Sequence, residues 1–316
     1  MSEPSTTAAI DGLQRLAENV SAVLAGRQNA AQIIVATFLA RGHLLMEDVP
    51  GVGKTTTAKA LAASVAGSWG RIQFTPDLLP SDLTGVTIYR QETATFDFHP
   101  GPLFHTVVIG DEINRASPKT QSALLECMAE RQVTVDGTSH ALPDPFMVIA
   151  TQNPVEMDGT YRLPEAQRDR FMARVSLGYP PEKEEWAMLA GGGFSDPLES
   201  IRAVMDLEDV HVASKEVEQV HASDAVLQYI LALVRATRTQ ANLALGLSPR
   251  AGLHMVRLAK SLAFLHGRDH VLPDDVQLLA PAAWAHRLLV TRSGRVEGVA
   301  PEEVLRHVVD EVPVTG

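Results

Sequence analysis

A glycine-rich turn near the start of the chain most constrains what this sequence can fold into. The segment PGVGKT (50–55) follows a short apolar run at 44–46 and precedes a helix-compatible stretch at 56–66. A strand, a glycine turn and a helix in this order are the context of a phosphate-binding loop. The backbone amides of such a turn and the helix N-terminus offer partial positive charge to phosphate groups. The sequence therefore predicts a nucleotide-binding loop at this point.

The residues of this loop have separate predicted roles. Lys54 is expected to reach the β- and γ-phosphates of ATP, and Thr55 to supply a hydroxyl ligand to Mg²⁺. The full motif begins with glycine where this chain has Asp48. Because a carboxylate is repelled by phosphate, we expect Asp48 to point away from the triphosphate. The residues predicted to surround the phosphates are Asp48, Val49, Pro50, Gly51, Val52, Gly53, Lys54, Thr55 and Thr56.

Two further polar segments follow apolar runs and complete the predicted site. The run at 107–109 leads to Asp111 and Glu112, and the run at 146–150 leads to Asn153. In open α/β sheets, ligands bind at the carboxyl ends of the strands. We expect Asp111 to bind Mg²⁺, directly or through water, and Glu112 to orient and deprotonate the attacking water. The amide of Asn153 is expected to hold that water.

The distribution of apolar runs predicts the fold class. Runs at 44–46, 72–74, 107–109, 146–150 and 175–177 alternate mostly with helical or turn-rich segments. This pattern is typical of a five-stranded, mainly parallel sheet in a three-layer α/β/α core. Hairpins are predicted at 86–98 and 132–142, the second from an Asp-Gly turn. The predicted division is a disordered N-terminus (1–9), the α/β/α core (10–180), a linker (181–214) and an all-α lid (215–316).

Composition limits the classes of partner. The chain has 27 Lys and Arg against 38 Asp and Glu, a net charge of −11. This balance disfavours non-specific binding to nucleic acid or to anionic lipid. One cysteine, Cys127, excludes an intramolecular disulfide. The N-terminal segment does not resemble a secretory signal, and the most apolar early window is too short to span a bilayer. We expect a cytoplasmic protein with no membrane insertion.

Several motifs in a fixed order resemble the AAA+ ATPases and, in detail, the MoxR family. The likeness extends from about residue 20 to about residue 289, and the lack of the first loop glycine also fits this family. The segments that resemble it are VPGVGKT (49–55), RIQFTPDLLPSDLTG (71–85), GDEINRASPKTQSALLE (110–126), ATQNP (150–154), LPEAQRDRF (163–171) and SPRAGL (248–253).

The resemblance implies roles for individual residues. Lys54 and Thr55 would belong to the Walker A motif, and Asp111 and Glu112 to the Walker B motif. By the same likeness Asn153 resembles sensor 1, Arg170 the arginine finger and Arg250 sensor 2. Gln28, in the turn at 26–28, resembles part of the adenine pocket, which we expect to be formed by residues 23–28 and Leu253.

The roles of two arginines can also be argued on physical grounds. Arg250 is expected in the first turn of a helix opened by Ser248 and Pro249, where a cation opposes the helix dipole. A γ-phosphate between core and lid would compensate the unfavourable charge of Arg250 there. Arg170 is expected to reach the nucleotide of a neighbouring subunit. Arg168, two residues earlier, is a second candidate for the finger, so the choice between the two stays open. Because arginine fingers contribute about 10³–10⁵ in rate, an isolated subunit is expected to be nearly inactive.

The resemblance also implies a function. A homo-oligomeric ring, a hexamer, would hydrolyse ATP with Mg²⁺ and remodel, activate or mature protein clients, among them proteins with von Willebrand factor A domains. The two hairpins resemble inserts that face the pore of such rings. Three alternatives stay open: an ATP-gated scaffold without significant turnover, a DNA or RNA motor, and a magnesium-chelatase-type motor subunit.

Overall fold

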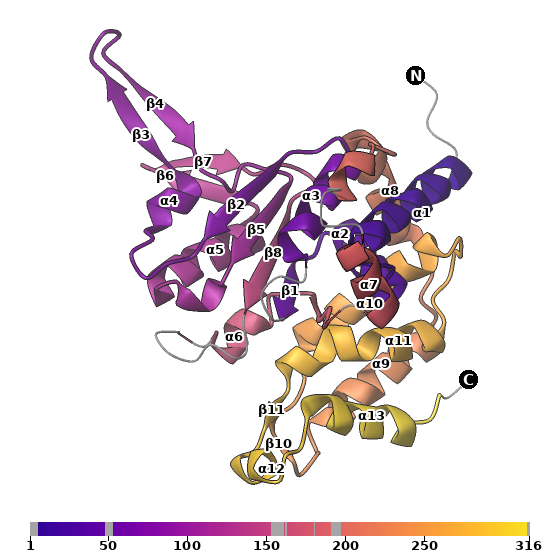
Figure 1. The fold of residues 1–316 in the computed structure, drawn as a ribbon. Helices are drawn as coiled ribbons and strands as arrows, with labels where there is room; N and C mark the ends of the chain where they lie inside the picture. Colours follow the sequence, from indigo (N-terminus) through magenta and orange to yellow (C-terminus); the bar gives the residue numbers. More distant parts are fainter. Residues whose placement is uncertain are drawn as a thin grey trace.

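A five-stranded parallel sheet lies at the centre of the molecule (Figure 1). The computed structural model describes residues 6–47, 53–152, 161, 163–179, 181–190 and 197–314. The strand order is β2-β5-β8-β1-β9, which confirms the predicted sheet. Two strands begin two to three residues before the predicted runs. The strands are β1 (Leu44–Glu47), β2 (Trp69–Gln73), β5 (Val107–Asp111), β8 (Met147–Gln152) and β9 (Ala173–Val175).

Helices cover both faces of this sheet because its strands are apolar on both sides. Successive strand residues point to opposite faces, so Leu44 and Met46 belong to one buried cluster and Leu45 to the other. Residues of α1, α2 and α3 pack in the first cluster, and residues of α4 and α5 in the second. These helices are α1 (Thr6–Val23), α2 (Gln28–Leu39), α3 (Lys54–Ser64), α4 (Pro80–Thr84) and α5 (Pro118–Glu130).

The start of the chain is more ordered than its composition indicated. Helix α1 begins at Thr6, so part of the segment expected to be disordered is helical. Alanine has the highest helix propensity, and Ala9 is buried against the rest of the molecule. Tertiary packing therefore extends the helix beyond the apolar stripe that the sequence shows. Residues 1–5 lie outside the described residues.

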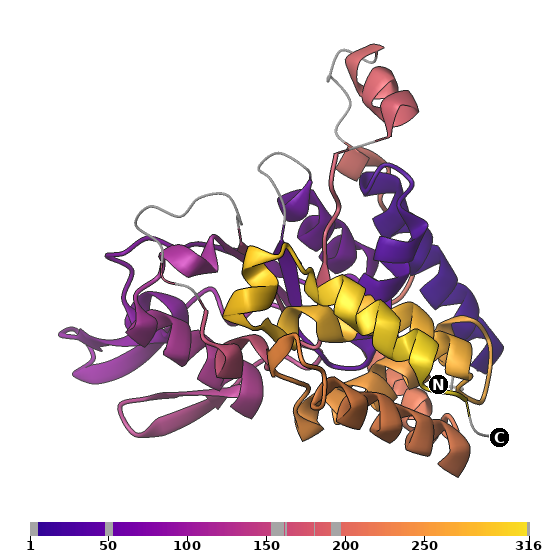
Figure 2. The same cartoon turned by 90° about the horizontal axis from the view of Figure 1, so that it is seen from below.

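Both predicted hairpins are present. Strand β3 (Gly85–Arg90) pairs with β4 (Thr95–Pro100), and β6 (Gln132–Val135) pairs with β7 (Thr138–Ala141). Asp136 and Gly137 both have positive φ, as a type I′ turn requires. The ring of Phe98 stacks on that of His140 with centroids 3.9 Å apart, which joins the two hairpins. Figure 2 shows both hairpins projecting from the same side of the molecule.

The C-terminal part is mainly helical and begins inside the predicted linker. Helix α8 starts at Leu207 because Asp206 and Asp209 form a capping box, a signal that the apolar spacing did not show. Two short strands, β10 (Leu243–Leu245) and β11 (Leu289–Val290), pair in a region predicted to be helical only. The remaining described helices are α6 (Glu165–Arg168), which precedes β9 in the core, and α7 (Glu182–Ala190), α8 (Leu207–Gln219), α9 (Asp224–Thr237), α10 (Pro249–Leu265), α11 (Pro273–Trp284), α12 (Arg292–Val296) and α13 (Pro301–Glu311). The short 3₁₀ turns are η1 (Ile113–Arg115), which follows β5 in the core, η2 (Pro197–Ser200) and η3 (Ala285–Arg287).

The C-terminal helices pack directly on the first helical layer. Helix α10 lies against α2, and buried residues of both belong to the cluster that covers one face of the sheet. The indole N–H of the fully buried Trp284 donates to the carbonyl of Ala251 at 3.1 Å. Among the described helices, none combines the length and apolar character that crossing a membrane requires. This packing determines where the polar residues of α10 lie relative to the sheet.

Candidate active site

The N-terminus of α3 contributes the phosphate-binding residues that the structure describes. Gly53 is the N-cap and has φ +91°, a backbone conformation that disfavours any residue with a side chain. Lys54 is the first residue of α3, and Thr55 and Thr56 follow in its first turn. The hydroxyl of Thr57 donates to the carbonyl of Gly53 at 2.9 Å. Five predicted loop residues lie outside the described residues: Asp48, Val49, Pro50, Gly51 and Val52.

Asp111 ends β5 with its carboxylate held by residues from both neighbouring strands. Its Oδ2 accepts a hydrogen bond from Arg71 Nε at 2.8 Å, and its Oδ1 accepts one from Thr151 Oγ1 at 3.4 Å. The Asp111 side chain is only 11% exposed, whereas that of Arg71 is 53% exposed. A carboxylate at this edge, together with the Thr55 hydroxyl, is the oxygen donor set that Mg²⁺ prefers. The described residues therefore fit the ion, and Arg71 neutralises Asp111 in this structure.

Glu112 is oriented by its backbone and by two side chains. Its φ of +59° is uncommon for a residue with a side chain, and its N–H donates to Thr151 Oγ1 at 3.0 Å. The carboxylate Oε2 accepts from Gln73 Nε2 at 3.2 Å and from Arg115 Nη1 at 3.1 Å. Such strained conformations cluster at functional sites, where the surrounding structure maintains them. Predicted sensor residue Asn153, one residue beyond β8, lies outside the described residues.

Four supporting residues were missed by the sequence analysis. Arg71 and Gln73 are two apart on β2 and so share a face of the strand next to β5, and Gln73 is in register with Asp111. That strand adjacency is not visible in the sequence. Thr151 could have been found from the sequence, because it belongs to the segment ATQNP (150–154), two residues before the predicted sensor Asn153. The four are Arg71, Gln73, Arg115 and Thr151.

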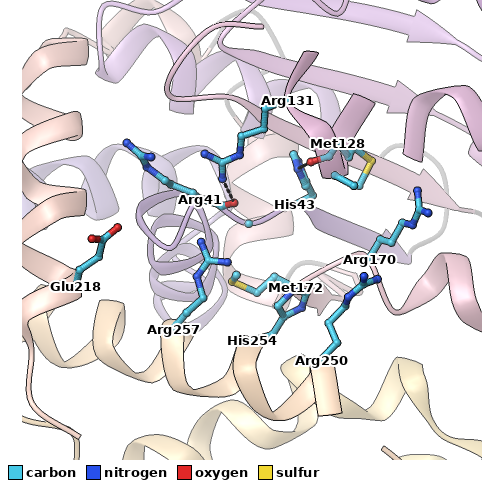
Figure 3. Close-up of a pocket in the computed structure, with 12 residues that line it drawn as sticks. Arg41, His43, Met128, Arg131, Arg170, Met172, Glu218, Arg250, His254 and Arg257 are labelled. Atoms are coloured by element: carbon cyan, nitrogen blue, oxygen red, sulfur yellow. Dashed lines mark hydrogen bonds between the residues drawn. The ribbon is translucent and has the colours of Figure 1, made fainter. Parts of the chain in front are cut away.

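Arg170 and Arg250 lie together at the opposite edge of the sheet. Arg170 precedes β9, as His43 precedes β1, so both are at the amino ends of their strands. With Arg250 they line a cavity of about 390 Å³, which we call the amino-edge cavity (Figure 3). Its described lining residues are Arg41, Gly42, His43, Met128, Ala129, Arg131, Arg170, Met172, Glu218, Arg250, His254 and Arg257.

A half-buried carboxylate joins the two segments that carry these arginines. The hydroxyl of Ser248, the N-cap of α10, lies 3.0 Å from both carboxylate oxygens of Asp169. Arg287 Nε lies 3.1 Å from Asp169 Oδ1, and the Nη2 of the same guanidinium donates to the carbonyl of Phe171. Burial lowers the pKa of Arg287 to about 10, and the Asp169 carboxylate opposes that shift. Asp169 thus ties the turn before β9 to the first turn of α10.

The two predicted groups of site residues are therefore separate within one chain. Asp111 and Glu112 lie at the carboxyl edge of the sheet, and Arg170 and Arg250 at the amino edge. A γ-phosphate between core and lid was expected beside Arg250, but Arg250 lines the amino-edge cavity, to which neither Lys54 nor Thr55 of α3 contributes. Arg168 lies 3.6 Å from Glu165 and is not among the lining residues of the amino-edge cavity, whereas Arg170 is.

Gln28 lines a second cavity, of about 640 Å³. The cavity lies between the turn at 26–28, strand β9 and helix α11, and Pro281 and Ala282 contribute its lid side. Leu253, expected to contact adenine, is not among the lining residues and its side chain is 66% exposed. On β9, Arg174 donates to Glu47 at 2.8 Å and forms a second ion pair with Glu302 of α13. This network links the strand before the phosphate loop to the C-terminal helix.

The fold and these residues define an AAA+ ATPase with a helical lid. Residues 43–173 match the ATPase family associated with various cellular activities (AAA), and residues 235–308 match the AAA lid domain. A solved crystal structure from Cytophaga hutchinsonii, provisionally named an ATPase, superposes with a TM-score of 0.91 at 36% identity, covering 98% of this chain and 97% of that one.

Relatives along nearly the whole chain identify the family. The chain is 38% identical to chaperone MoxR1 of Mycobacterium tuberculosis, covering 96% of this chain and 83% of that protein. It is 32% identical to protein MoxR of Paracoccus denitrificans, covering 86% and 87%. Protein YeaC of Bacillus subtilis, which is named as uncharacterized, is 47% identical over 96% of this chain. The chain belongs to the MoxR family of AAA+ ATPases.

Proposed function

We propose that this chain hydrolyses Mg²⁺-ATP in a cytoplasmic ring of identical subunits, a hexamer, and uses the cycle to remodel or activate protein clients. The observation that supports this most is the separation of the site between the two edges of one sheet. The residues that would bind and attack the triphosphate lie at one edge, and the cations that would stabilise the transition state lie at the other. A complete site then needs two subunits.

At the carboxyl edge, Lys54 would bind the β- and γ-phosphates, and the α3 N-terminus would add its partial positive charge. Thr55 and Asp111 would hold Mg²⁺, which when bound neutralises part of the phosphate charge. Glu112 would accept the proton of the attacking water. Gln73 and Arg115 would orient the Glu112 carboxylate, and the Asn153 amide would position the water.

At the amino edge, Arg170 and Arg250 would extend into the nucleotide site of the next subunit. Their guanidinium groups would stabilise the negative charge of the transferring phosphoryl group. Because both arginines line the same cavity, and the Ser248–Asp169 contact joins their segments, they would act together rather than in different sites. Arg170 fits the finger role better than Arg168, which lies outside the amino-edge cavity.

The client is a protein in this proposal, because MoxR1, a relative at 38% identity, is named a chaperone. The hairpin β3–β4 projects from the body of the subunit (Figure 1) and offers exposed apolar side chains for such contacts, Phe96 and Tyr89 among them. Proteins with von Willebrand factor A domains are the client class to test first. Glu112→Gln, which should bind ATP and hydrolyse it poorly, is the variant with which to trap them.

The test is subunit mixing. Glu112→Gln subunits lack the base but retain both arginines, and Arg170→Ala subunits lack the finger but retain an intact carboxyl edge. Each variant alone should therefore be nearly inactive. Mixed rings would contain interfaces with an intact Glu112 on one side and Arg170 on the other, and ATPase activity should reappear. Wild-type activity per subunit should rise with protein concentration. Activity of the Lys54→Ala protein, or full activity of dilute monomers, would contradict the proposal.

A scaffold that binds ATP without turnover is the alternative of a different class. The orientation of Glu112 by two donors disfavours it, since a pure binding switch needs no positioned base. Single-turnover hydrolysis by the assembled ring separates the two: a scaffold would retain labelled ATP intact over many minutes, and the proposed enzyme would convert it to ADP and phosphate.

A further inference from the structure

The amino-edge cavity contains more arginine than the proposed finger and sensor need. Of its described lining residues, five are arginines and one, Glu218, is acidic. Figure 3 shows Arg170 and Arg250 together on one side and the other three arginines on the other side. These three, Arg41, Arg131 and Arg257, have no role in the proposed hydrolysis.

The three arginines come from different elements; backbone carbonyls hold two of them, and Arg41 Nη2 lies 3.1 Å from Asp144 Oδ2 and 3.0 Å from His211 Nδ1. Arg41 directly follows the C-cap of α2, Arg131 is the C-cap of α5, and Arg257 belongs to α10. Arg131 Nη2 donates to the carbonyl of Arg41 at 2.8 Å (Figure 3), and Arg257 Nη2 donates to the carbonyl of Ala40 at 3.0 Å. These carbonyl acceptors position the guanidinium groups of Arg131 and Arg257 without neutralising their charge.

The charge of this group is only partly compensated. Burial lowers the pKa of Arg131 and of Arg257, and repulsion from Arg41 lowers both further. Asp144 lies 3.1 Å from Arg41 but its side chain is 46% exposed, and it is not among the described lining residues. Glu218 stabilises the charge of Arg257. One exposed and one lining carboxylate therefore face three clustered guanidinium groups.

Two of these arginines lie at backbone positions that favour glycine. Arg41 has φ +56° and Arg131 has φ +53°, in the left-handed region that glycine adopts freely and that a side chain disfavours. Helices very commonly end with glycine in this conformation. Arg41 Nε is also buried and has no hydrogen-bond acceptor among the described residues. A ligand bound in the cavity would supply the acceptor that Arg41 Nε lacks in the described part of the chain.

We propose that Arg41, Arg131 and Arg257 form a binding site for a free, doubly charged tetrahedral oxyanion of the inorganic phosphate type. Guanidinium groups match phosphate oxygens with paired N–H donors, and a dianion balances the clustered charge better than a carboxylate. The cavity of about 390 Å³ lies toward the small end of ligand pockets. This site lies at the opposite edge from the phosphate loop, and it does not depend on the proposed ATPase activity.

The experiment titrates inorganic phosphate into nucleotide-free protein by calorimetry at constant ionic strength. The Lys54→Ala protein is used throughout, so that the phosphate loop does not produce the signal. We expect saturable binding that Arg41→Gly or Arg131→Gly, each added to Lys54→Ala, weakens about 10- to 100-fold. Glycine adopts the left-handed backbone without strain, so both variants should fold, which thermal unfolding checks. Arg306→Gln, an exposed arginine of α13, is the matched control and should leave binding unchanged.

Several results would overturn the proposal. One is the absence of saturable phosphate binding to the Lys54→Ala protein. Another is binding of acetate as tight as that of phosphate at the same ionic strength, because a site for a dianion should bind the acetate monoanion more weakly. A third is binding that Arg170→Ala abolishes but that both glycine variants leave intact, since phosphate would then bind to the finger and sensor arginines. Sulfate, which has the same shape and charge as a phosphate dianion, should compete with phosphate.

Discussion

The hydroxyl of Ser248 lies 3.0 Å from both carboxylate oxygens of Asp169. Ser248 is two residues before Arg250, and Asp169 is directly before Arg170. This contact joins the helical lid to the turn before β9, and the two joined segments carry arginines that are 80 residues apart in the chain. Arg287 braces the same carboxylate from η3. The geometry of this pair is a property of the lid–core junction rather than of either segment alone.

Ser248→Ala should lower ATPase activity more than it lowers stability. Loss of the N-cap should cost about 1 kcal/mol in the free energy of unfolding. Misplacement of Arg170 and Arg250 should reduce turnover of the assembled ring about 10- to 100-fold. Chemical denaturation and steady-state ATPase assays measure the two effects.

Ser223→Ala is the matched control, because Ser223 caps α9 in the same way. It should cost similar stability and leave turnover near wild type; equal turnover in both variants would contradict a positioning role for Ser248.

Arg250 should act on the nucleotide of the neighbouring subunit. Arg250→Ala subunits should be nearly inactive alone and should regain activity when mixed with Glu112→Gln subunits, because some interfaces then combine intact Glu112 with intact Arg250. An arginine that acted within its own subunit could not be complemented in this way. The measurement is ATPase activity across mixing ratios, and activity that merely falls in proportion to dilution would refute the assignment.

Gln73→Ala should lower turnover without weakening ATP binding. Glu112 would lose one of its two side-chain donors, and we expect turnover to fall about 10-fold, a fraction of what a general base contributes. ATP affinity, measured with a fluorescent analogue, should stay unchanged because Gln73 lies on β2, outside the phosphate loop. Adding Gln73→Ala to Glu112→Gln should have no further effect on turnover. An additional loss in that double variant would show that Gln73 acts through another group.

Stability should fall on acidification because His43 is buried in its neutral form. Its Nδ1 accepts the Val148 N–H at 3.0 Å, and its Nε2 is 3.1 Å from the Met128 carbonyl. Burial lowers the pKa of His43 to about 4, compared with 6.5 when unfolded. Between these values the unfolded chain binds more protons, so the free energy of unfolding should fall by up to about 1.4 kcal/mol per pH unit for this one group as pH drops below 6.5.

The measurement for His43 is chemical denaturation between pH 5 and 8, values chosen around the unperturbed pKa. His43→Gln should have a smaller slope of unfolding free energy against pH than wild type, whatever its absolute stability. His307→Gln, at an exposed helix position paired with Glu311, should keep the wild-type slope. An unchanged slope in His43→Gln would mean that His43 takes up its proton equally in the folded and unfolded chain.

The sheet and its two hairpins were predictable because their signals are local. Apolar runs, glycine turns and the Asp-Gly pair at 136–137 each determine backbone conformation within a few residues. The start of α8 was also readable in principle, from the acidic capping box at 206–209. The start of α1 at Thr6 was not, because burial of Ala9 depends on residues distant in the sequence. The β10–β11 pair joins residues more than 40 apart, and no local pattern encodes such pairing.

By itself, the sequence determined which chemistry is present: a phosphate-loop lysine, adjacent carboxylates after a buried strand, and two arginines in recognisable motifs. Only the tertiary structure decided how those groups are distributed, with Arg71 and Gln73 beside the carboxylates and Arg250 beside Arg170 at the far edge of the sheet. The physical reason is that the two properties depend on interactions of different range along the chain. Backbone conformation follows from neighbouring residues, whereas the position of a charged side chain follows from packing and desolvation, which depend on every element around it.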